Sequence, residues 1–132
     1  MASSEVQITN LLFRYAELID AGDFPALNVL FQHARIDLIG DGGETQGRAG
    51  NEVGDMMSEQ VMLYEDGTPR TKHVITNPIV EVDEDAGTGE CRSYYTVLQR
   101  VDADQPLQPI ITGRYSVRLR WRLRSPIWST LE

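Results

Sequence analysis

The chain contains one cysteine and two histidines in 132 residues, so it has few nitrogen or sulfur ligands for a metal. Cys91 alone cannot form an intramolecular disulfide, and structural zinc sites draw their ligands mainly from cysteine and histidine. Basic residues are also scarce, with 12 lysines and arginines against 20 aspartates and glutamates and a formal net charge of −8. This charge argues against nucleic acid or an anionic membrane as the main partner.

Long apolar runs are absent as well. No segment approaches the roughly 20 residues that cross a bilayer, and the N-terminus lacks the basic and apolar parts of a signal peptide, so we expect a cytoplasmic protein. With 41% apolar and 24% charged residues, the chain predicts one ordered domain over 1–132. Phosphate-binding glycine motifs, the nucleophile elbow and the His-Glu-x-x-His motif are missing, and we expect neither metal nor cofactor.

The first half of the chain has the apolar spacing of helices. Apolar side chains recur at helical intervals from Ile8 to Ile19, and Gly22 fits the position just past the helix end. A short second helix follows, and a third is expected from about 50 to 63. Between the second and third helices, residues 35–40 predict a short strand that leads into a glycine-rich loop.

The second half changes to β-strand patterns. Residues 71–82 and 90–101 are rich in β-branched and aromatic side chains, and an acidic turn containing glycine joins them as a hairpin. After a loop with two prolines, a third strand begins near Ile110 and extends to Leu123. Helices followed by an antiparallel meander predict the α+β class rather than alternating βαβ units.

His73 is the first candidate for chemistry. In a strand, His73, Ile75 and Asn77 share the face opposite to that of their neighbours. A histidine and an amide beside an isoleucine suit a mainly apolar cavity with a few polar groups. The alternative from the residues alone is a structural histidine whose ring nitrogens are satisfied.

Asp20 lies in the last turn of the first helix, where the helix dipole disfavours an anion by about 0.3–1 kcal/mol. It is either a solvated carboxylate beside a turn or a partly buried one that holds a histidine in one tautomer. Tyr15, on the same helix, is either a core residue or a pocket residue. Tyr94 and Tyr95 point to opposite faces of their strand, so only one of them reaches the cavity, and the parity of a bulge would reverse which one.

Several strings of the sequence together resemble the SnoaL-like proteins of the nuclear transport factor 2-like superfamily. They fall within residues 5–116 and are Leu11–Phe24, His73–Pro78, Val80–Asp83, Ser93–Leu98 and Gly113–Tyr115. The resemblance implies a cone-shaped α+β domain, a cystatin-like roll. In such a domain a curved, mainly antiparallel mixed sheet packs against the N-terminal helices around a deep pocket.

Within that superfamily the chain is similar to the scytalone dehydratases and the bile-acid 7α-dehydratases. These enzymes have a tyrosine and an aspartate five positions apart on the first helix and a pocket histidine on a strand, so the similarity implies that Tyr15, Asp20 and His73 are catalytic. They also carry a second histidine or an aspartate on a later strand, whereas residues 91–99 contain neither. We predict that the remaining substrate-binding residues are Leu18, Ile75, Asn77, Tyr95 and Arg114.

The C-terminal segment departs from the family pattern. Residues 117–124 alternate apolar and arginine side chains, which predicts a half-buried strand, and the segment 117–132 is either native and atypical or truncated or shifted in frame. A stripe of arginines on an acidic protein also predicts a homo-oligomer, a dimer or a trimer, in which the arginines meet carboxylates or solvent.

These observations lead to a functional hypothesis. We predict a cofactor-independent lyase, a dehydratase, or an isomerase that acts on a small, largely apolar hydroxylated or carbonyl compound. His73 would remove a proton next to a carbonyl, Asp20 would orient the imidazole and offset its charge, and Tyr15 would donate a hydrogen bond. The alternatives are a non-catalytic protein that binds a small hydrophobic ligand and a structural partner of the dioxygenase β-subunit type.

Overall fold

The computed structural model describes residues 2–39, 42–43, 45–122 and 125–131, with the side chains at 36–39, 45–46 and 121–131 outside that description. The predicted glycine-rich loop and the predicted strand end at Leu123 therefore lie partly or wholly outside the described residues. None of the helices in the described ranges has the length and apolar character needed to cross a membrane.

The helices begin and end where local chemistry favours it. The Ser3 hydroxyl accepts a hydrogen bond from the Val6 amide at 3.3 Å, which caps the first helix, and Gly22 follows its end with a φ of +73°. The predicted third helix starts with a short 3₁₀ turn and ends at residue 60 rather than 63. The helical elements are α1 (Ser4–Asp20), α2 (Phe24–Leu30), η1 (Gly50–Glu52) and α3 (Val53–Gln60).

Six strands form one sheet in the order β2-β1-β6-β5-β4-β3. Neighbouring strands are antiparallel except β1 and β6, which are parallel, so the sheet is mixed and mainly antiparallel. The prediction of an α+β fold is confirmed. The strands are β1 (Arg35–Ile39), β2 (Thr45–Ala49), β3 (Thr71–Asp83), β4 (Thr88–Gln99), β5 (Gln108–Arg122) and β6 (Ser125–Leu131).

β2 and β6 were not predicted as separate strands. β2 reads Thr-Gln-Gly-Arg-Ala and has few residues that favour strands, whereas β6 carries a proline near its start. β6 joins the meander to the N-terminal half of the chain, because it pairs with β5 on one side and with β1 on the other. Residues 117–131 therefore extend the sheet where the structure describes them.

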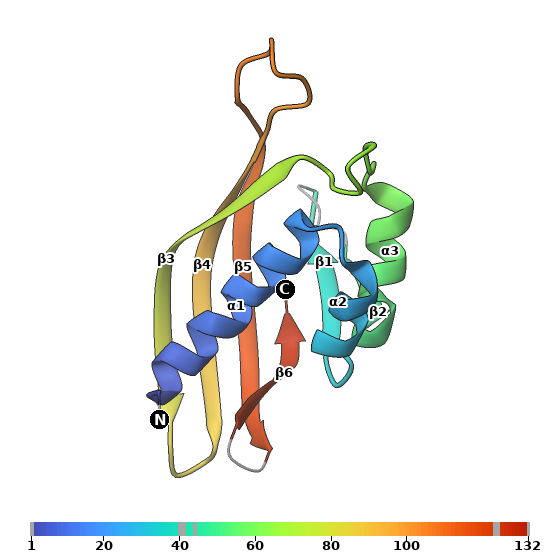
Figure 1. Ribbon diagram of the computed structural model, residues 1–132. Helices are drawn as coiled ribbons and strands as arrows, with labels where there is room; N and C mark the ends of the chain where they lie inside the picture. Colours follow the sequence, from blue (N-terminus) through green and yellow to red (C-terminus); the bar gives the residue numbers. More distant parts are fainter. Residues whose placement is uncertain (1, 40–41, 44, 123–124, 132) are drawn as a thin grey trace.

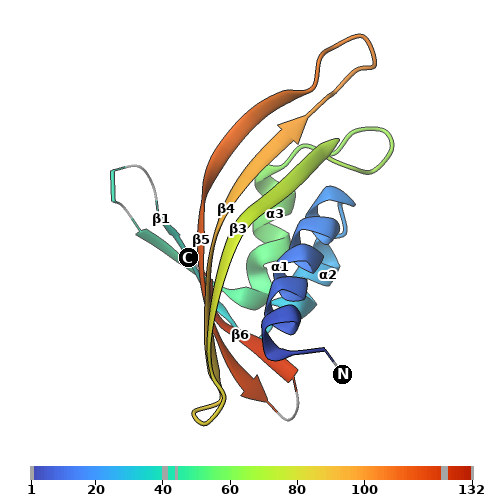
Figure 2. The ribbon, with the colours of Figure 1, turned by 90° about the vertical axis from the view of Figure 1, so that its left-hand side faces the viewer.

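The helices all lie against one face of a curved sheet (Figures 1 and 2). α1 runs across the inner face of β3 and β4 from the hairpin end toward the start of β3, and the Ser4 hydroxyl bonds the Glu84 carboxylate at the hairpin. The core forms between this helix and the strands. Its side chains include Ile8, Leu12, Tyr15, Ile19, Phe31, Cys91, Val117 and Leu119.

A β-bulge interrupts the alternation of β3. The pairing with β4 shifts between Thr76 and Ile79, and Asn77 has a φ of +57°. Asparagine tolerates this left-handed conformation better than most residues. Before the bulge His73 and Ile75 are the more buried positions, and after it Val80 and Val82 pack against the core.

Candidate active site

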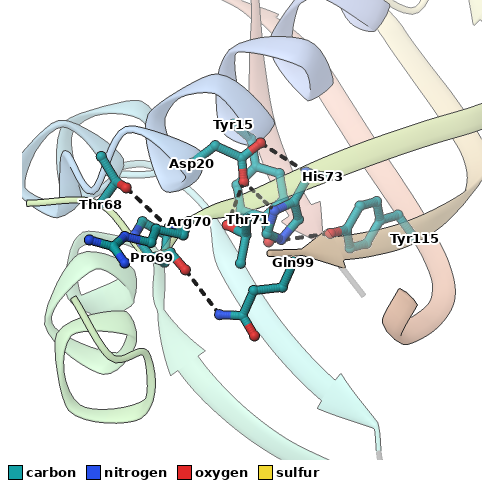
Figure 3. A network of polar contacts seen from close by, with 9 residues as sticks. All are labelled: Tyr15, Asp20, Thr68, Pro69, Arg70, Thr71, His73, Gln99 and Tyr115. Atoms are coloured by element: carbon teal, nitrogen blue, oxygen red, sulfur yellow. Dashed lines mark hydrogen bonds and ion pairs between the residues drawn. The ribbon is translucent and has the colours of Figure 1, made fainter. Parts of the chain in front are cut away.

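Asp20, at the end of α1, reaches the first residues of β3 and accepts three hydrogen bonds. Its Oδ1 atom receives one from the Thr71 hydroxyl and one from His73 Nδ1, both at 2.8 Å. Its Oδ2 atom receives the His73 backbone amide, also at 2.8 Å. The geometry follows from alternation, because Thr71 and His73 share one face of β3, and α1 ends beside that face (Figure 3).

The contact with Asp20 fixes the tautomer of His73. An ionised carboxylate can only accept hydrogen bonds, so Nδ1 carries the proton and Nε2 of the neutral ring keeps its lone pair. Among the residues that the structure describes, none makes a hydrogen bond to Nε2. The pair is shielded, with 9% of the His73 side chain and 13% of the Asp20 side chain exposed. The contact with Asp20 therefore occupies Nδ1 and leaves Nε2 without a hydrogen-bond partner in the part of the chain that the structure describes.

Burial and hydrogen bonding act in opposite directions on Asp20. Desolvation by itself would raise the carboxyl pKa, but the hydrogen bonds from the His73 ring, the His73 amide and Thr71 stabilise the anion. The net result is a pKa below the ordinary value of an aspartate. Asp20 is thus an anion under neutral conditions, and its negative charge lies directly beside the His73 ring.

Tyr15 lies five residues before Asp20 on α1, and its ring packs edge-on against His73 with centroids 6.0 Å apart. Its hydroxyl accepts a hydrogen bond from the Tyr115 hydroxyl at 3.3 Å. Burial raises the pKa of Tyr15 to about 12, so it is a neutral phenol and can donate a hydrogen bond. The structure therefore brings Tyr15, Asp20 and His73 together.

Three of the other predicted binding residues face the interior. Leu18 and Ile75 are half-buried and pack against the core cluster. Tyr95 lies on the inner face of β4 and stacks on Tyr115, while Tyr94 on the opposite face is 53% exposed. Of the two tyrosines between which the sequence left the choice open, Tyr95 is thus the one that points inward.

Asn77 and Arg114 are not brought to the site. Asn77 sits in the bulge of β3, where its positive φ ends the alternation that would have pointed it inward, and its side chain is exposed. Arg114 is exposed opposite Tyr94 on the outer face, because Gly113 and Tyr115 on either side of it point inward. The structure therefore does not bring these two residues to the group formed by Tyr15, Asp20 and His73.

The residues just before β3 are held by contacts with the end of β4 and with the segment that follows it. The Gln99 side-chain amide donates to the Pro69 carbonyl at 3.0 Å (Figure 3). The Arg70 guanidinium donates to the Val101 carbonyl at 2.6 Å. Arg70 itself has a φ of +56°, a strained conformation for a long side chain. These contacts hold the start of β3 in the position where Thr71 and His73 reach the Asp20 carboxylate.

Two further residues, Thr71 and Tyr115, touch the site and were not predicted from the sequence. Thr71 has the same strand parity as His73, and Tyr115 shares parity with the inward Val117. Strand alternation was the available signal in both cases.

No group of three or more histidine, cysteine, aspartate or glutamate side chains gathers as a metal site within the described residues. The polar atoms of the site are one imidazole, one carboxylate, a threonine hydroxyl and two phenols. This set supports proton transfer and hydrogen-bond donation.

Comparison with known proteins agrees with this architecture. The sequence profile of the SnoaL-like domain matches residues 1–128, and the chain belongs to that family. No curated protein sequence matches the chain significantly.

Solved structures share the fold at low sequence identity. A nuclear transport factor 2-like protein with a cystatin-like fold from Novosphingobium aromaticivorans is 20% identical, with a TM-score of 0.72 over 98% of this chain and 79% of that one. A candidate scytalone dehydratase from the same organism is 15% identical, with a TM-score of 0.68 over 95% and 78%. The β subunit of a candidate aromatic-ring-hydroxylating dioxygenase, also from that organism, is 13% identical, with a TM-score of 0.72 over 96% and 85%. These likenesses establish the cystatin-like fold.

Proposed function

We propose that the protein is a cofactor-independent acid–base lyase or isomerase that acts on a small, largely apolar hydroxylated or carbonyl compound. The observation that carries the proposal is the shielded contact between Asp20 Oδ1 and His73 Nδ1 at 2.8 Å, with Tyr15 packed against the imidazole. Asp20 binds both the ring and the backbone amide of His73, which a solvated surface aspartate does not do. The likeness to a candidate scytalone dehydratase is consistent with this chemistry.

In the proposed reaction His73 Nε2 removes a proton from a carbon next to a carbonyl group. The electron pair of the broken C–H bond moves toward the carbonyl, whose oxygen accepts a hydrogen bond from Tyr15 while Asp20 offsets the imidazolium charge. In a dehydration a new C=C bond forms as the C–O bond of a β-hydroxyl breaks, and the hydroxyl leaves with a proton from the imidazolium as water. In an isomerisation the same proton returns at another carbon.

The test begins with ligand identification. Hydroxylated polycyclic and terpenoid compounds are screened for an increase in melting temperature, and the compounds that bind are then incubated with the protein and analysed by mass spectrometry for loss of water or rearrangement. Turnover that disappears in His73→Ala supports the proposal. Binding without turnover in the parent protein would instead identify a carrier of small hydrophobic ligands.

A structural role beside a larger enzyme is the other candidate, because the fold matches the β subunit of a candidate dioxygenase. The buried dyad argues against it, since a purely structural subunit has no need of an available histidine nitrogen. We also propose that the protein works in the cytoplasm as a homo-oligomer, a dimer or a trimer, that forms through the outer face of its sheet.

A further inference from the structure

The hydrogen bond between Tyr115 and Tyr15 has a direction. The Tyr115 hydroxyl donates to the Tyr15 hydroxyl oxygen at 3.3 Å, and the two rings meet edge to face with centroids 5.6 Å apart. A phenol has a single proton, so Tyr15 accepts here and keeps its own proton for another acceptor. The described residues provide no such acceptor for it, and the Tyr15 side chain lies against His73.

A phenol that accepts a hydrogen bond becomes more acidic and a phenol that donates one becomes less acidic, and Tyr15 and Tyr115 follow this rule. Burial raises the pKa of Tyr15 to about 12, and the hydrogen bond that it accepts from Tyr115 works against that increase. Burial also raises the pKa of Tyr115, and donation to Tyr15 raises it further. Tyr15 is therefore the more acidic phenol of the pair and the stronger hydrogen-bond donor.

The ring of Tyr115 is itself held in place. Tyr95 stacks on it with centroids 4.3 Å apart and an interplanar angle of 12°. Tyr95 can adopt this position because its ring passes over Gly113, where an added Cβ would lie 2.6 Å from the Tyr95 Cε1 and Oη atoms. Any larger residue at position 113 would displace Tyr95 and remove the support of Tyr115.

We propose that Tyr115 is a positioning residue that turns the Tyr15 hydroxyl proton away from the core and toward the substrate. Tyr95 and Gly113 keep the Tyr115 ring in place. The inference rests on the proposed function only for its catalytic consequence. The orientation of the two hydroxyls is a property of the protein alone and can be measured without a substrate.

The first experiment uses 3-fluorotyrosine incorporated at position 15, because fluorine lowers the phenol pKa into a range where the fold survives and its NMR signal reports ionisation. Tyr115→Phe keeps the ring but removes the donor, so the pKa of residue 15 should rise by about one unit. Tyr94→Phe, on the exposed face, is the matched control and should leave it unchanged. An unchanged or lowered pKa in a Tyr115→Phe protein with a parental melting temperature would overturn the proposal.

Two further variants test the support of the ring. Tyr95→Leu and Gly113→Ala both keep the Tyr115 hydroxyl and should raise the same pKa, by less than Tyr115→Phe does. If Gly113→Ala does not fold, Tyr95→Leu alone decides this point. A pKa at position 15 that is insensitive to Tyr95→Leu would remove Tyr95 and Gly113 from the proposal.

The kinetic experiment uses the compound that the parent protein converts. Tyr115→Phe should lower kcat about 5- to 10-fold with little change in KM, and Tyr15→Phe/Tyr115→Phe should be no slower than Tyr15→Phe. Two losses that multiply would show that Tyr115 acts independently of Tyr15 and would overturn the proposal. If the parent converts no compound while the fluorotyrosine results hold, the proposed function fails and the hydroxyl orientation stands.

Discussion

Asp20 accepts two hydrogen bonds of 2.8 Å from His73, one from the ring and one from the backbone amide. β3 is an edge strand of the sheet, and no strand in the described part of the chain pairs with the amides on its outer edge. One carboxylate therefore satisfies an edge amide and orients the ring beside it. These bonds also explain a carboxylate at a helix C-terminus, since each contributes about 1.5–3 kcal/mol against a dipole penalty of about 0.3–1 kcal/mol.

Asp20→Asn tests the role of the negative charge. The amide keeps the shape of the side chain but cannot offset an imidazolium, so kcat should fall about 100-fold while KM changes little. Steady-state kinetics on an identified substrate measure both constants. Glu17→Gln, an exposed charge removal on the same helix, is the control and should behave like the parent. Equal losses in the two variants would mean that the charge acts at long range rather than through His73.

His73→Ala removes the proposed base. We expect kcat to fall by about 10²- to 10⁴-fold, the range of general acid–base catalysis. The fold should persist, because Asp20 still accepts hydrogen bonds from Thr71 and from the backbone amide of residue 73. Circular dichroism and thermal melting check the fold, and single-turnover assays check the rate. Parental activity in this variant would show that His73 is not the base.

The lowered pKa of Asp20 predicts how its contribution to stability depends on pH. Below 3.8, the ordinary pKa of an aspartate, the unfolded chain binds a proton that the folded protein still excludes, so stability rises with pH in that window. The stabilisation by Asp20 is complete above about pH 5 and decreases as the pH falls through the folded pKa. The difference in unfolding free energy between the parent and Asp20→Asn should therefore narrow as the solution is acidified.

Urea unfolding of the parent and Asp20→Asn over a series of pH values measures that difference. The contributions of the other carboxylates to the pH dependence are the same in both proteins and cancel. Thr71→Val removes one of the three hydrogen bonds to Asp20. In a Thr71→Val background, Asp20→Asn should therefore change the unfolding free energy at neutral pH by less than it does in the parent. A parent-to-variant difference that is constant with pH would contradict the cause assigned to the lowered pKa.

Strand alternation predicted the face of His73 and of Ile75 because both lie before the bulge of β3. It failed at Asn77, where the backbone adopts a φ of +57° that no pattern of apolar residues encodes. Arg114 was placed toward the site although its own neighbours argue otherwise. Tyr115 and Val117 are inward on β5, so alternation alone puts Arg114 outside.

The fold was predictable to the extent that it is local. The helices and the β3–β4–β5 meander follow from periodicity and turns, and their positions agree with the structure to within a few residues. The pairing of β6 with β1 joins Arg35 to Thr130 and depends on contacts far apart in the sequence. The contact of Asp20 with His73 is of the same kind, and only the resemblance to a family suggested it.

Asn77 provides a test of the bulge. An alanine in the left-handed region is disfavoured by about 1–2 kcal/mol, whereas glycine adopts it freely, so Asn77→Ala should destabilise the protein by about that amount and Asn77→Gly should not. Because the side chain is exposed, neither variant should change KM strongly. Chemical denaturation and kinetics separate the two effects. A large increase in KM with unchanged stability would return Asn77 to the binding site.

The outer face of the sheet provides the last prediction. Ile79 and Tyr94 are 52% and 53% exposed there, and the face is acidic along β3, at Glu81, and basic along β5, at Arg118 and Arg120. A two-fold axis near the centre of the face would place the acidic strand of one copy over the basic strand of the other. Trp121 and Arg122, included in the sequence-based prediction of this contact, have side chains outside the described residues.

Light scattering at micromolar concentration should therefore give a multiple of the chain mass. Tyr94→Glu places a charge in the centre of the face and should produce monomers, whereas Tyr94→Phe should assemble like the parent. Raising the salt concentration should weaken assembly, because charges across the contact are screened. A parent protein that is strictly monomeric at micromolar concentration would contradict the proposed contact, and an assembly unaffected by Tyr94→Glu would place it on another surface.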